Sequence, residues 1–201
     1  MTPSYSIEQV REEIKSAREK KTAVVFKNMF MDVPEWKQFI EHADYQSAFH
    51  SDFEEDDYYK SLGRIFKRHN FYLQVADAVT NNPDMHNFFP QTSPVISFFD
   101  QVFEQRCNGG PSFFNISGIE PDVNTHDDEW DNVSWQCIGT TWWEVRHNRE
   151  DVDPHTVFEL NPGDIIVIPE GVQHAVVKKT ARAGITLSYN VVQKEYVNRL
   201  Y

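Results

Sequence analysis

Two histidines and one aspartate, His126, Asp128 and His174, are the residues of this chain whose types and spacing could bind a metal ion. A single residue separates His126 from Asp128, and His174 follows much later in the chain. Two imidazoles and one carboxylate can form a facial triad, which holds Fe(II) on one face and leaves positions open for a co-substrate and O2. If these side chains meet, the sequence predicts an oxygenase. If they do not, it predicts an acidic β domain with surface histidines.

The segment before His174 predicts a short strand with a turn on each side. Residues 161–164, Asn-Pro-Gly-Asp, predict a tight turn, residues 165–168 are apolar, and residues 169–171, Pro-Glu-Gly, predict a second turn. Glycine permits turn geometries that other residues resist, and proline fixes the exit from the strand. The spacing resembles the second cupin motif, G-x5-P-x-G-x2-H. A chance match at all four positions is on the order of one in a thousand for a chain of this length.

The segment around His126 keeps the spacing of the first cupin motif, H-x-H-x3-E-x6-G. Its four positions hold His126, Asp128, Asn132 and Gly139. Asp128 replaces a histidine and Asn132 replaces the glutamate, so a four-ligand site becomes a three-ligand site that is open to a bidentate acid and dioxygen. Residues 126 and 128 share one face of a strand, so both side chains are expected to point into one barrel mouth.

Together the two segments resemble the JmjC and cupin-like Fe(II)/2-oxoglutarate hydroxylases, including the asparaginyl hydroxylase of the hypoxia response. The resemblance covers residues 113–192. It is carried by His126, Asp128, Asn132, Gln136, Gly139, Trp142, Trp143, residues 160–164, Ile168, Pro169, His174 and Asn190. It implies a double-stranded β-helix, the jelly-roll or cupin barrel. It also implies Fe(II) held by the catalytic residues His126, Asp128 and His174, with 2-oxoglutarate and O2 as co-substrates.

The resemblance further implies the reaction. 2-Oxoglutarate would be decarboxylated to succinate and CO2 while a C–H bond of the substrate is hydroxylated or demethylated. A protein or peptide side chain is a candidate substrate by analogy only. The substrate, the atom oxidised and the oligomeric state are left open by the sequence.

One departure from the family concerns 2-oxoglutarate. Many members carry a lysine two residues after the motif glycine, which pairs with the distal carboxylate; here that residue is Thr141. A buried carboxylate needs a cationic partner, and a guanidinium fits it bidentately. Arg182 is the candidate, because it begins the strand after His174. Arg146 and Lys178 are alternatives, and a surface position for Arg182 at a hairpin tip is the competing interpretation.

Strand alternation extends this prediction along the last strand. Arg182 is expected to share a face with Gly184, Thr186, Ser188 and Asn190. We therefore expect Thr141, Arg182 and Asn190 to contact the co-substrate. Asn132 is expected either beside the metal or facing the substrate. Gln136 and Thr140 are further candidates for lining the cavity.

The elements that must position these residues fall into two parts. Residues 1–107 predict helices with one early strand at residues 23–26; the helices begin at Ser6, where Gln9 completes a capping box, near Pro34, and over residues 71–79 and 95–105. Residues 108–201 predict seven short strands, a pattern typical of a sandwich or barrel. These strands are 113–117, 133–138, 140–146, 157–160, 164–168, 174–178 and 183–192. We predict one α+β domain over residues 1–201, with N-terminal helices packed on a double-stranded β-helix.

Composition narrows the possible partners and location. With 201 residues, 40% of them hydrophobic, the chain is long enough for one globular domain. Its net charge of −12 disfavours nucleic acid and anionic membranes as partners. The acidic residues 52–57 are expected to form a solvated loop, with a docking surface for a basic substrate as the alternative. Two cysteines and the lack of a signal core or long apolar run predict a soluble, cytoplasmic protein.

Two other functions fit the same residues. A cupin oxygenase or isomerase would use the metal without 2-oxoglutarate, as the missing lysine allows. A metal- or ligand-binding cupin-like module would have a regulatory role and no catalysis.

Overall fold

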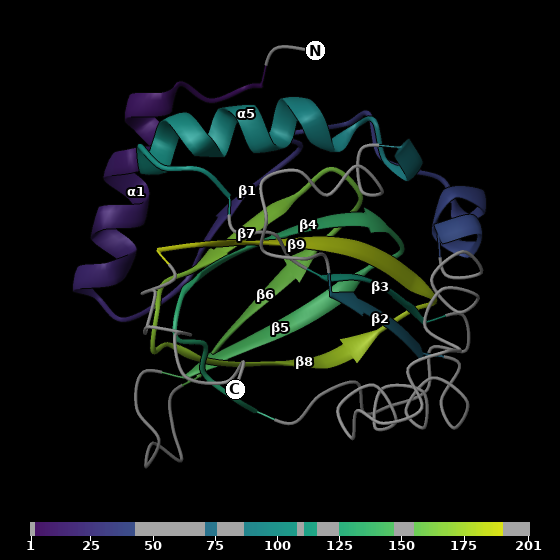
Figure 1. Cartoon of the computed structure of the whole chain (residues 1–201). Coiled ribbons are helices and arrows are strands. Elements are labelled where there is room, and N and C mark those ends of the chain that lie inside the picture. Colours follow the sequence, from purple (N-terminus) through teal and green to yellow (C-terminus); the bar gives the residue numbers. More distant parts are fainter. Residues whose placement is uncertain are drawn as a thin grey trace, which may run out of the picture.

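The computed structural model describes residues 3–42, 71–75, 87–107, 111–115, 125–146 and 155–190 (Figure 1). The helices are α1 (Ile7–Glu19) and α5 (Thr92–Phe103), and residues 36–42 are also helical. The strands are β1 (Val24–Phe26), β2 (Phe71–Val75), β3 (Pro111–Asn115), β4 (Asp131–Ile138), β5 (Thr141–Arg146), β6 (Thr156–Leu160), β7 (Ile165–Ile168), β8 (Gln173–Lys179) and β9 (Arg182–Tyr189). The predicted acidic loop at residues 52–57 lies outside the described residues.

The strands form two antiparallel sheets. The larger sheet has the order β1-β7-β4-β9-β3-β2, and the smaller has the order β6-β5-β8. In Figure 1, α5 lies along one side of the larger sheet, and the smaller sheet lies on the other side. The described part of the chain is therefore mainly β, with helices against one sheet face.

The two faces of the larger sheet have different chemistry because side chains alternate along a strand. Towards the helices, Trp135 of β4 and Ile185 of β9 pack in one apolar cluster with Phe99 of α5. Burying rings of this size is a main source of stability. Towards the smaller sheet, the same strands present a buried polar row. Its members are Asn132, Ser134, Gln136, Arg182, Thr186 and Ser188.

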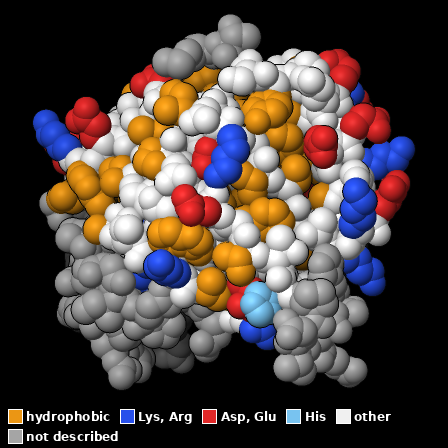
Figure 2. Space-filling view, turned by 180° about the vertical axis from the view of Figure 1, so that it is seen from behind, with side chains coloured by type: hydrophobic (Ala, Val, Ile, Leu, Met, Phe, Trp, Pro, Cys, Tyr) orange, Lys and Arg blue, Asp and Glu red, His pale blue; other side chains and the backbone are white. Residues whose placement is uncertain are grey.

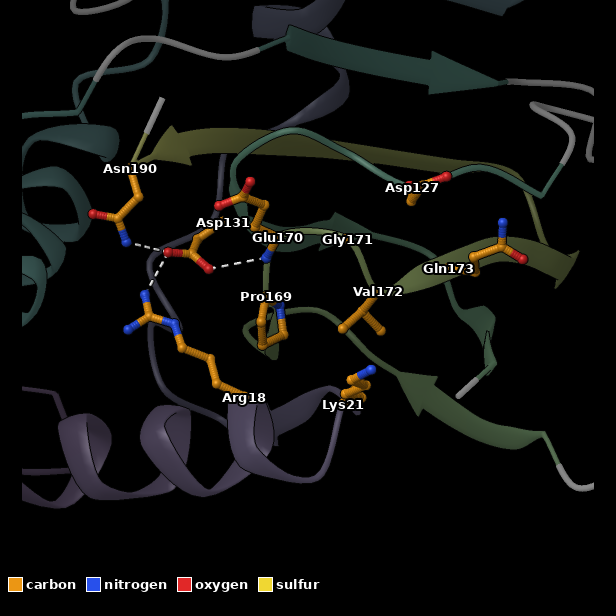
Figure 3. Close-up of a pocket in the computed structure, with 10 residues that line it drawn as sticks. All are labelled: Arg18, Lys21, Asp127, Asp131, Pro169, Glu170, Gly171, Val172, Gln173 and Asn190. Carbon is orange, nitrogen blue, oxygen red and sulfur yellow. Dashed lines mark hydrogen bonds and ion pairs between the residues drawn. The ribbon is translucent and has the colours of Figure 1, made fainter. Parts of the chain in front are cut away.

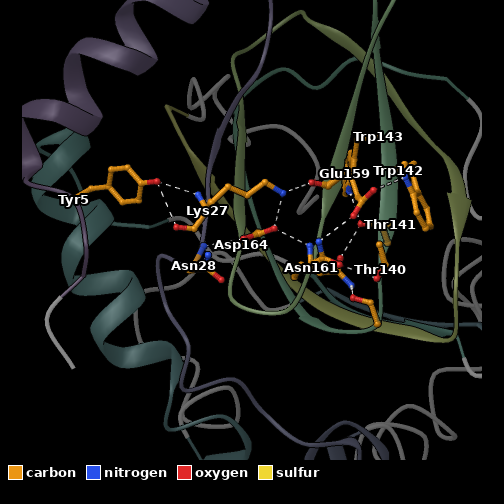
Figure 4. Close-up of polar contacts among 12 residues, drawn as sticks. Tyr5, Lys27, Asn28, Thr140, Thr141, Trp142, Trp143, Glu159, Asn161 and Asp164 are labelled. Atoms are coloured by element: carbon orange, nitrogen blue, oxygen red, sulfur yellow. Dashed lines mark hydrogen bonds and ion pairs between the residues drawn. The ribbon is translucent and has the colours of Figure 1, made fainter.

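A buried carboxylate joins β1 to the turn before β7 (Figure 4). Asp164 is 1% exposed and accepts hydrogen bonds from Lys27 Nζ and the Asn28 amide, each at 2.8 Å. It also accepts one from the Asn161 amide at 2.8 Å. The turn that leads into β7 is thus anchored to the N-terminal segment.

The predicted elements are largely confirmed. The capping box of Ser6 and Gln9 begins α1. The strands of the C-terminal half start within two residues of their predicted positions. The helix predicted over residues 71–79 is wrong where it is described, because residues 71–75 form β2 and pair with β3 at a sheet edge. The sequence there, Phe-Tyr-Leu-Gln-Val, is rich in residues that favour strands, and a short apolar run cannot separate strand from helix.

Among the described residues, the large apolar side chains that remain exposed are Met31, Ile40, Val157 and Val177. On the face in Figure 2, charged side chains of both signs lie singly or in small groups among uncharged ones. Within the described residues, no helix has the length and apolarity needed to cross a bilayer.

Candidate metal centre

Backbone hydrogen bonds bring the two motif segments together. The His126 amide donates to the His174 carbonyl at 3.1 Å, and the His174 amide donates back at 2.8 Å. The Gly171 amide donates to the Asp128 carbonyl at 2.9 Å. The strand expected at residues 126–128 is reduced to this single bridge, so simple alternation does not place the side chains. They nevertheless converge.

His126, Asp128 and His174 each present a ligand atom within 4.8 Å of the other two. His174 Nε2 lies 3.6 Å from Asp128 Oδ2, and His126 Nε2 lies 3.9 Å from Asp128 Oδ1. Two nitrogen or oxygen ligands that each lie about 2.1 Å from an ion are roughly 3 Å apart when the ligand–metal–ligand angle is a right angle. Small side-chain rotations would therefore let the three residues bind one ion.

The surroundings of His174 favour the form that binds a metal. The imidazole is 1% exposed, and its Nδ1 lies 3.0 Å from the Val172 carbonyl oxygen. A carbonyl only accepts, so Nδ1 carries the hydrogen and Nε2 faces Asp128 with its lone pair. Burial lowers the pKa of His174, while the Val172 carbonyl and Asp128 act to raise it. A neutral imidazole near pH 7 is the form that binds a metal.

Thr141 lies between the two sheets, where it contacts Gln136 of the larger sheet. It is fully buried; its hydroxyl donates to Gln136 Oε1 at 2.9 Å and accepts from Trp143 Nε1 at 3.1 Å. The Trp143 ring stacks on His174, with centroids 5.8 Å apart. Thr141 is thus connected to a metal-ligand candidate through one indole. Thr140, in contrast, bonds to Asn161 at the strand ends and not within this interior.

Arg182 is buried, 3% exposed, on the polar face of β9. The interpretation of Arg182 as a surface charge at a hairpin tip is therefore wrong. The alternative cations Lys178 and Arg146 are on the outer face of the smaller sheet, where Lys178 sits 4.5 Å from the Trp142 ring centroid. Arg146 pairs there with Glu144.

Lys179 is the residue that the sequence reasoning missed. It is 8% exposed and is the strand partner of Thr141, so both side chains share the inner face. Plain alternation from His174 would instead turn Lys178 inward. A β-bulge where β8 passes Trp142 and Trp143 shifts the register by one residue. Nothing in the local sequence marks that bulge.

Asn190 does not share the face of Arg182, and this part of the prediction is wrong. β9 ends at Tyr189, and Asn190 has φ 54°, a left-handed conformation that redirects its side chain. The amide of Asn190 donates to Asp131, which is also bound by Arg18 of α1. The contact of Asn190 with 2-oxoglutarate stays a prediction and would require this bond to open.

A pocket of about 700 Å³ is lined by chain neighbours of the three ligand candidates, and none of the three candidates lines it (Figure 3). Asp127, between His126 and Asp128, and Gln173, next to His174, contribute to its wall. Its remaining lining is Arg18, Lys21, Asp131, residues 169–172 and Asn190. Charges of both signs surround it, so it suits a polar molecule.

Solved 2-oxoglutarate oxygenases have a similar fold. The chain aligns with the X-ray structure of Escherichia coli YcfD with a TM-score of 0.56 and 17% identity, over 90% of this chain and 53% of YcfD. The structure of YcfD, a ribosomal oxygenase from Escherichia coli, in complex with cobalt and 2-oxoglutarate aligns with a TM-score of 0.52 and 16% identity. This alignment covers 90% of this chain and 52% of YcfD. An oxidoreductase of the 2OG-Fe(II) oxygenase family from Burkholderia pseudomallei aligns with a TM-score of 0.50 and 14% identity. This alignment covers 94% of this chain and 91% of the Burkholderia protein.

These likenesses concern the fold alone. The structural resemblance predicted from the two motifs is confirmed at that level. This chain spans about half the length of YcfD. No protein family and no curated protein matches the sequence.

Proposed function

We propose that this chain is an Fe(II)- and 2-oxoglutarate-dependent dioxygenase that hydroxylates its substrate, with His126, Asp128 and His174 as the iron ligands. The observation that carries the proposal is the convergence of two imidazoles and one carboxylate within 4.8 Å, from segments far apart in the sequence. This donor set suits Fe(II) and leaves coordination positions open. The likeness of the fold to 2-oxoglutarate oxygenases supports it.

We also propose a jelly roll as the finer description of the fold. Four strands of the larger sheet, β3, β9, β4 and β7, would face β8, β5 and β6. The bridge between His126 and His174 would supply the eighth strand position. In this arrangement the metal ligands lie at the mouth and Thr141 lies at the deep end. A single domain over residues 1–201 is part of the same proposal.

Arg182 would pair with the distal carboxylate of 2-oxoglutarate. Its guanidinium belongs to the polar face that also carries Asn132, which contacts Asp128. Thr141 would donate its hydroxyl hydrogen to that carboxylate in place of Gln136 Oε1, and Lys179 is a second cation on the inner face at the level of Thr141. Bidentate pairing makes Arg182 the stronger candidate.

Bound iron would supply the activation of O2, and the protein residues would do the rest. His126, Asp128 and His174 would hold the ion. The buried wall around Trp143 and Val145 would exclude water, which protects a reactive oxidant. YcfD is named as a ribosomal oxygenase, so a protein side chain is our candidate substrate.

Thermal unfolding with Mn(II) and 2-oxoglutarate, added singly and together, tests the proposal without a known substrate. A ligand that binds the folded state raises Tm by mass action. We expect Mn(II) to raise Tm, and 2-oxoglutarate to raise it further only when metal is present. A metal response without a 2-oxoglutarate response would favour a cupin oxygenase or isomerase. No metal response would leave a non-catalytic module.

A further inference from the structure

A line of buried polar side chains runs along the inner wall of the larger sheet to Asp128. Asn132 Nδ2 lies 3.0 Å from Asp128 Oδ2, and Ser134 Oγ lies 2.9 Å from Asn132 Oδ1. Ser134 Oγ is in turn 2.8 Å from Thr186 Oγ1 on the neighbouring strand. Asn132, Ser134 and Thr186 are 7%, 3% and 5% exposed, so water does not compete for these bonds.

The direction of every bond in this line follows from Asp128. An ionised carboxylate only accepts hydrogen bonds, so the amide nitrogen of Asn132 faces it and the amide oxygen faces Ser134. Ser134 then uses its one hydrogen on Asn132. The hydroxyl of Thr186 must therefore donate to Ser134. The four groups form a directed chain, Thr186 to Ser134 to Asn132 to Asp128.

We propose that Asn132, held by Ser134 and Thr186, is a positioning residue that fixes the rotation of the Asp128 carboxylate. This rests on the proposed function, in which Asp128 binds the metal. The terminal torsion of an aspartate is broad and has no strong preference of its own. The Asn132 amide uses one lone pair of Oδ2, which favours Oδ1 as the metal-binding oxygen. A carboxylate that binds the metal through one oxygen leaves open a coordination position that a bidentate carboxylate would fill.

Titration of the full chain with Co(II) alone, followed by its visible absorption, tests this proposal. Loss of a hydrogen-bond partner to a metal ligand typically costs 10- to 100-fold in metal affinity. We expect Asn132→Leu, which has a similar shape and no donor, to weaken Co(II) binding by about that factor. Its Co(II) absorption should also change in intensity, because a freely rotating carboxylate alters the coordination.

Variants of Ser134 distinguish positioning from packing. Ser134→Ala should weaken Co(II) binding, whereas Ser134→Thr keeps the hydroxyl and should bind as the wild type does. Because the bonds act in series, adding Thr186→Val to Ser134→Ala should cause little further loss. Ser188→Ala is the matched control: Ser188 is 8% exposed on the same face, and its side chain has no described hydrogen bond. Its Co(II) affinity should be unchanged.

Each outcome separates the positioning role from the metal site itself. If Asn132→Leu and Ser134→Ala bind Co(II) with wild-type affinity and absorption while His174→Ala loses binding, the positioning role is wrong and the metal site stands. An equal loss in Ser188→Ala would also contradict the positioning role, since it would indicate a general effect of packing. If the wild type does not bind Co(II), both proposals fail. Should Asn132→Leu not fold, the Ser134 pair decides alone.

Discussion

Two buried cations lie on the inner faces of the sheets, where the proposed function places 2-oxoglutarate. Arg182 lies on the inner face of the larger sheet, and Lys179 lies on the inner face of the smaller one. A cation held in a dry interior interacts with a carboxylate far more strongly than one at the surface. In the function we propose, the buried Arg182 would therefore take the place of a lysine at the position of Thr141.

Arg182→Met should weaken 2-oxoglutarate binding and spare the metal. Removing one partner of a desolvated charge pair costs about 2 kcal/mol or more, which is about 30-fold in Kd. Calorimetric titration of 2-oxoglutarate into the Mn(II)-loaded protein measures it. Lys178→Met is the control, because Lys178 packs on Trp142 on the outer face. An unchanged Kd for Arg182→Met would remove Arg182 from the site, and a loss in Lys179→Met alone would transfer the role to Lys179.

At this scale the sequence predicts what is local. The local residues predict the turns at Gly163 and Gly171, both of which have positive φ. They also predict the spacing from these turns to His174. The contact of Asn132 with Asp128 and the inward turn of Lys179 are not. They depend on strand register, and one bulge changes which lysine faces inward.

Elements far apart in the sequence are held to the sheets by a few buried polar groups. Asp164 joins β1 to the turn before β7 through the Lys27 ammonium and the Asn28 and Asn161 amides. Asp131 does the same for α1 and the end of β9, through Arg18 and Asn190. Each carboxylate is 1% exposed. Removing one of its hydrogen-bond partners would therefore leave a buried polar group unsatisfied and destabilise the fold.

Asp164→Asn should destabilise the fold. The change removes a charge that three donors share, and breaking charged hydrogen bonds in a buried site costs about 2–3 kcal/mol. Urea unfolding measures the difference in free energy. Glu41→Gln is the control, because its pair with Lys37 is on the surface and is worth less than about 1 kcal/mol. A loss no larger than that of the control would show that the Asp164 network is not an anchor.

His42 predicts how the stability of the protein depends on pH. Residues 36–42 are helical, and the His42 ring packs against Phe88 and Phe89 with centroids 5.0 Å away. Burial lowers its pKa to about 4. The unfolded chain binds a proton near pH 6.5, so stability is full above that pH and falls as the pH drops towards 4.

The contribution of His42 to the free energy of unfolding should fall by about 2 kcal/mol between pH 7 and pH 5. Urea unfolding of the wild type and of His42→Phe at both pH values measures it. The variant should lose less stability than the wild type over this interval by that amount. Parallel losses in the two proteins would mean that His42 is not the titrating group.

Most elements are predictable because their signals are short-range. A capping box begins α1, and turn residues separate the C-terminal strands. β2 is the exception: its sequence suits either type of element, and only its pairing with β3 selects the strand. Pairing partners between distant segments are not visible in one sequence.

The whole molecule shares one core between its two parts. Val10 and Phe99 from the N-terminal helices lie in the same apolar cluster as Trp135 and Ile185 from the strands. β1 also completes the larger sheet by pairing with β7. The C-terminal strands therefore pack against residues 1–107, which is consistent with the single domain we propose.

Residues 108–201 expressed alone should not unfold cooperatively, because the helix-facing side of the larger sheet would be exposed. Near-ultraviolet circular dichroism and urea unfolding, compared with the full chain, measure this. A fragment with a native-like signal and a sharp transition would mean that the strands form an independent domain.

In the function we propose, His126, Asp128 and His174 hold Fe(II) so that 2-oxoglutarate can chelate it. The most direct measurement is an anaerobic titration with Fe(II) and 2-oxoglutarate, followed by visible absorption. A weak charge-transfer band should develop only when both are present, and it should be absent in Asp128→Ala. Binding of Fe(II) with no change on addition of 2-oxoglutarate, or a band that persists in Asp128→Ala, would contradict the claim.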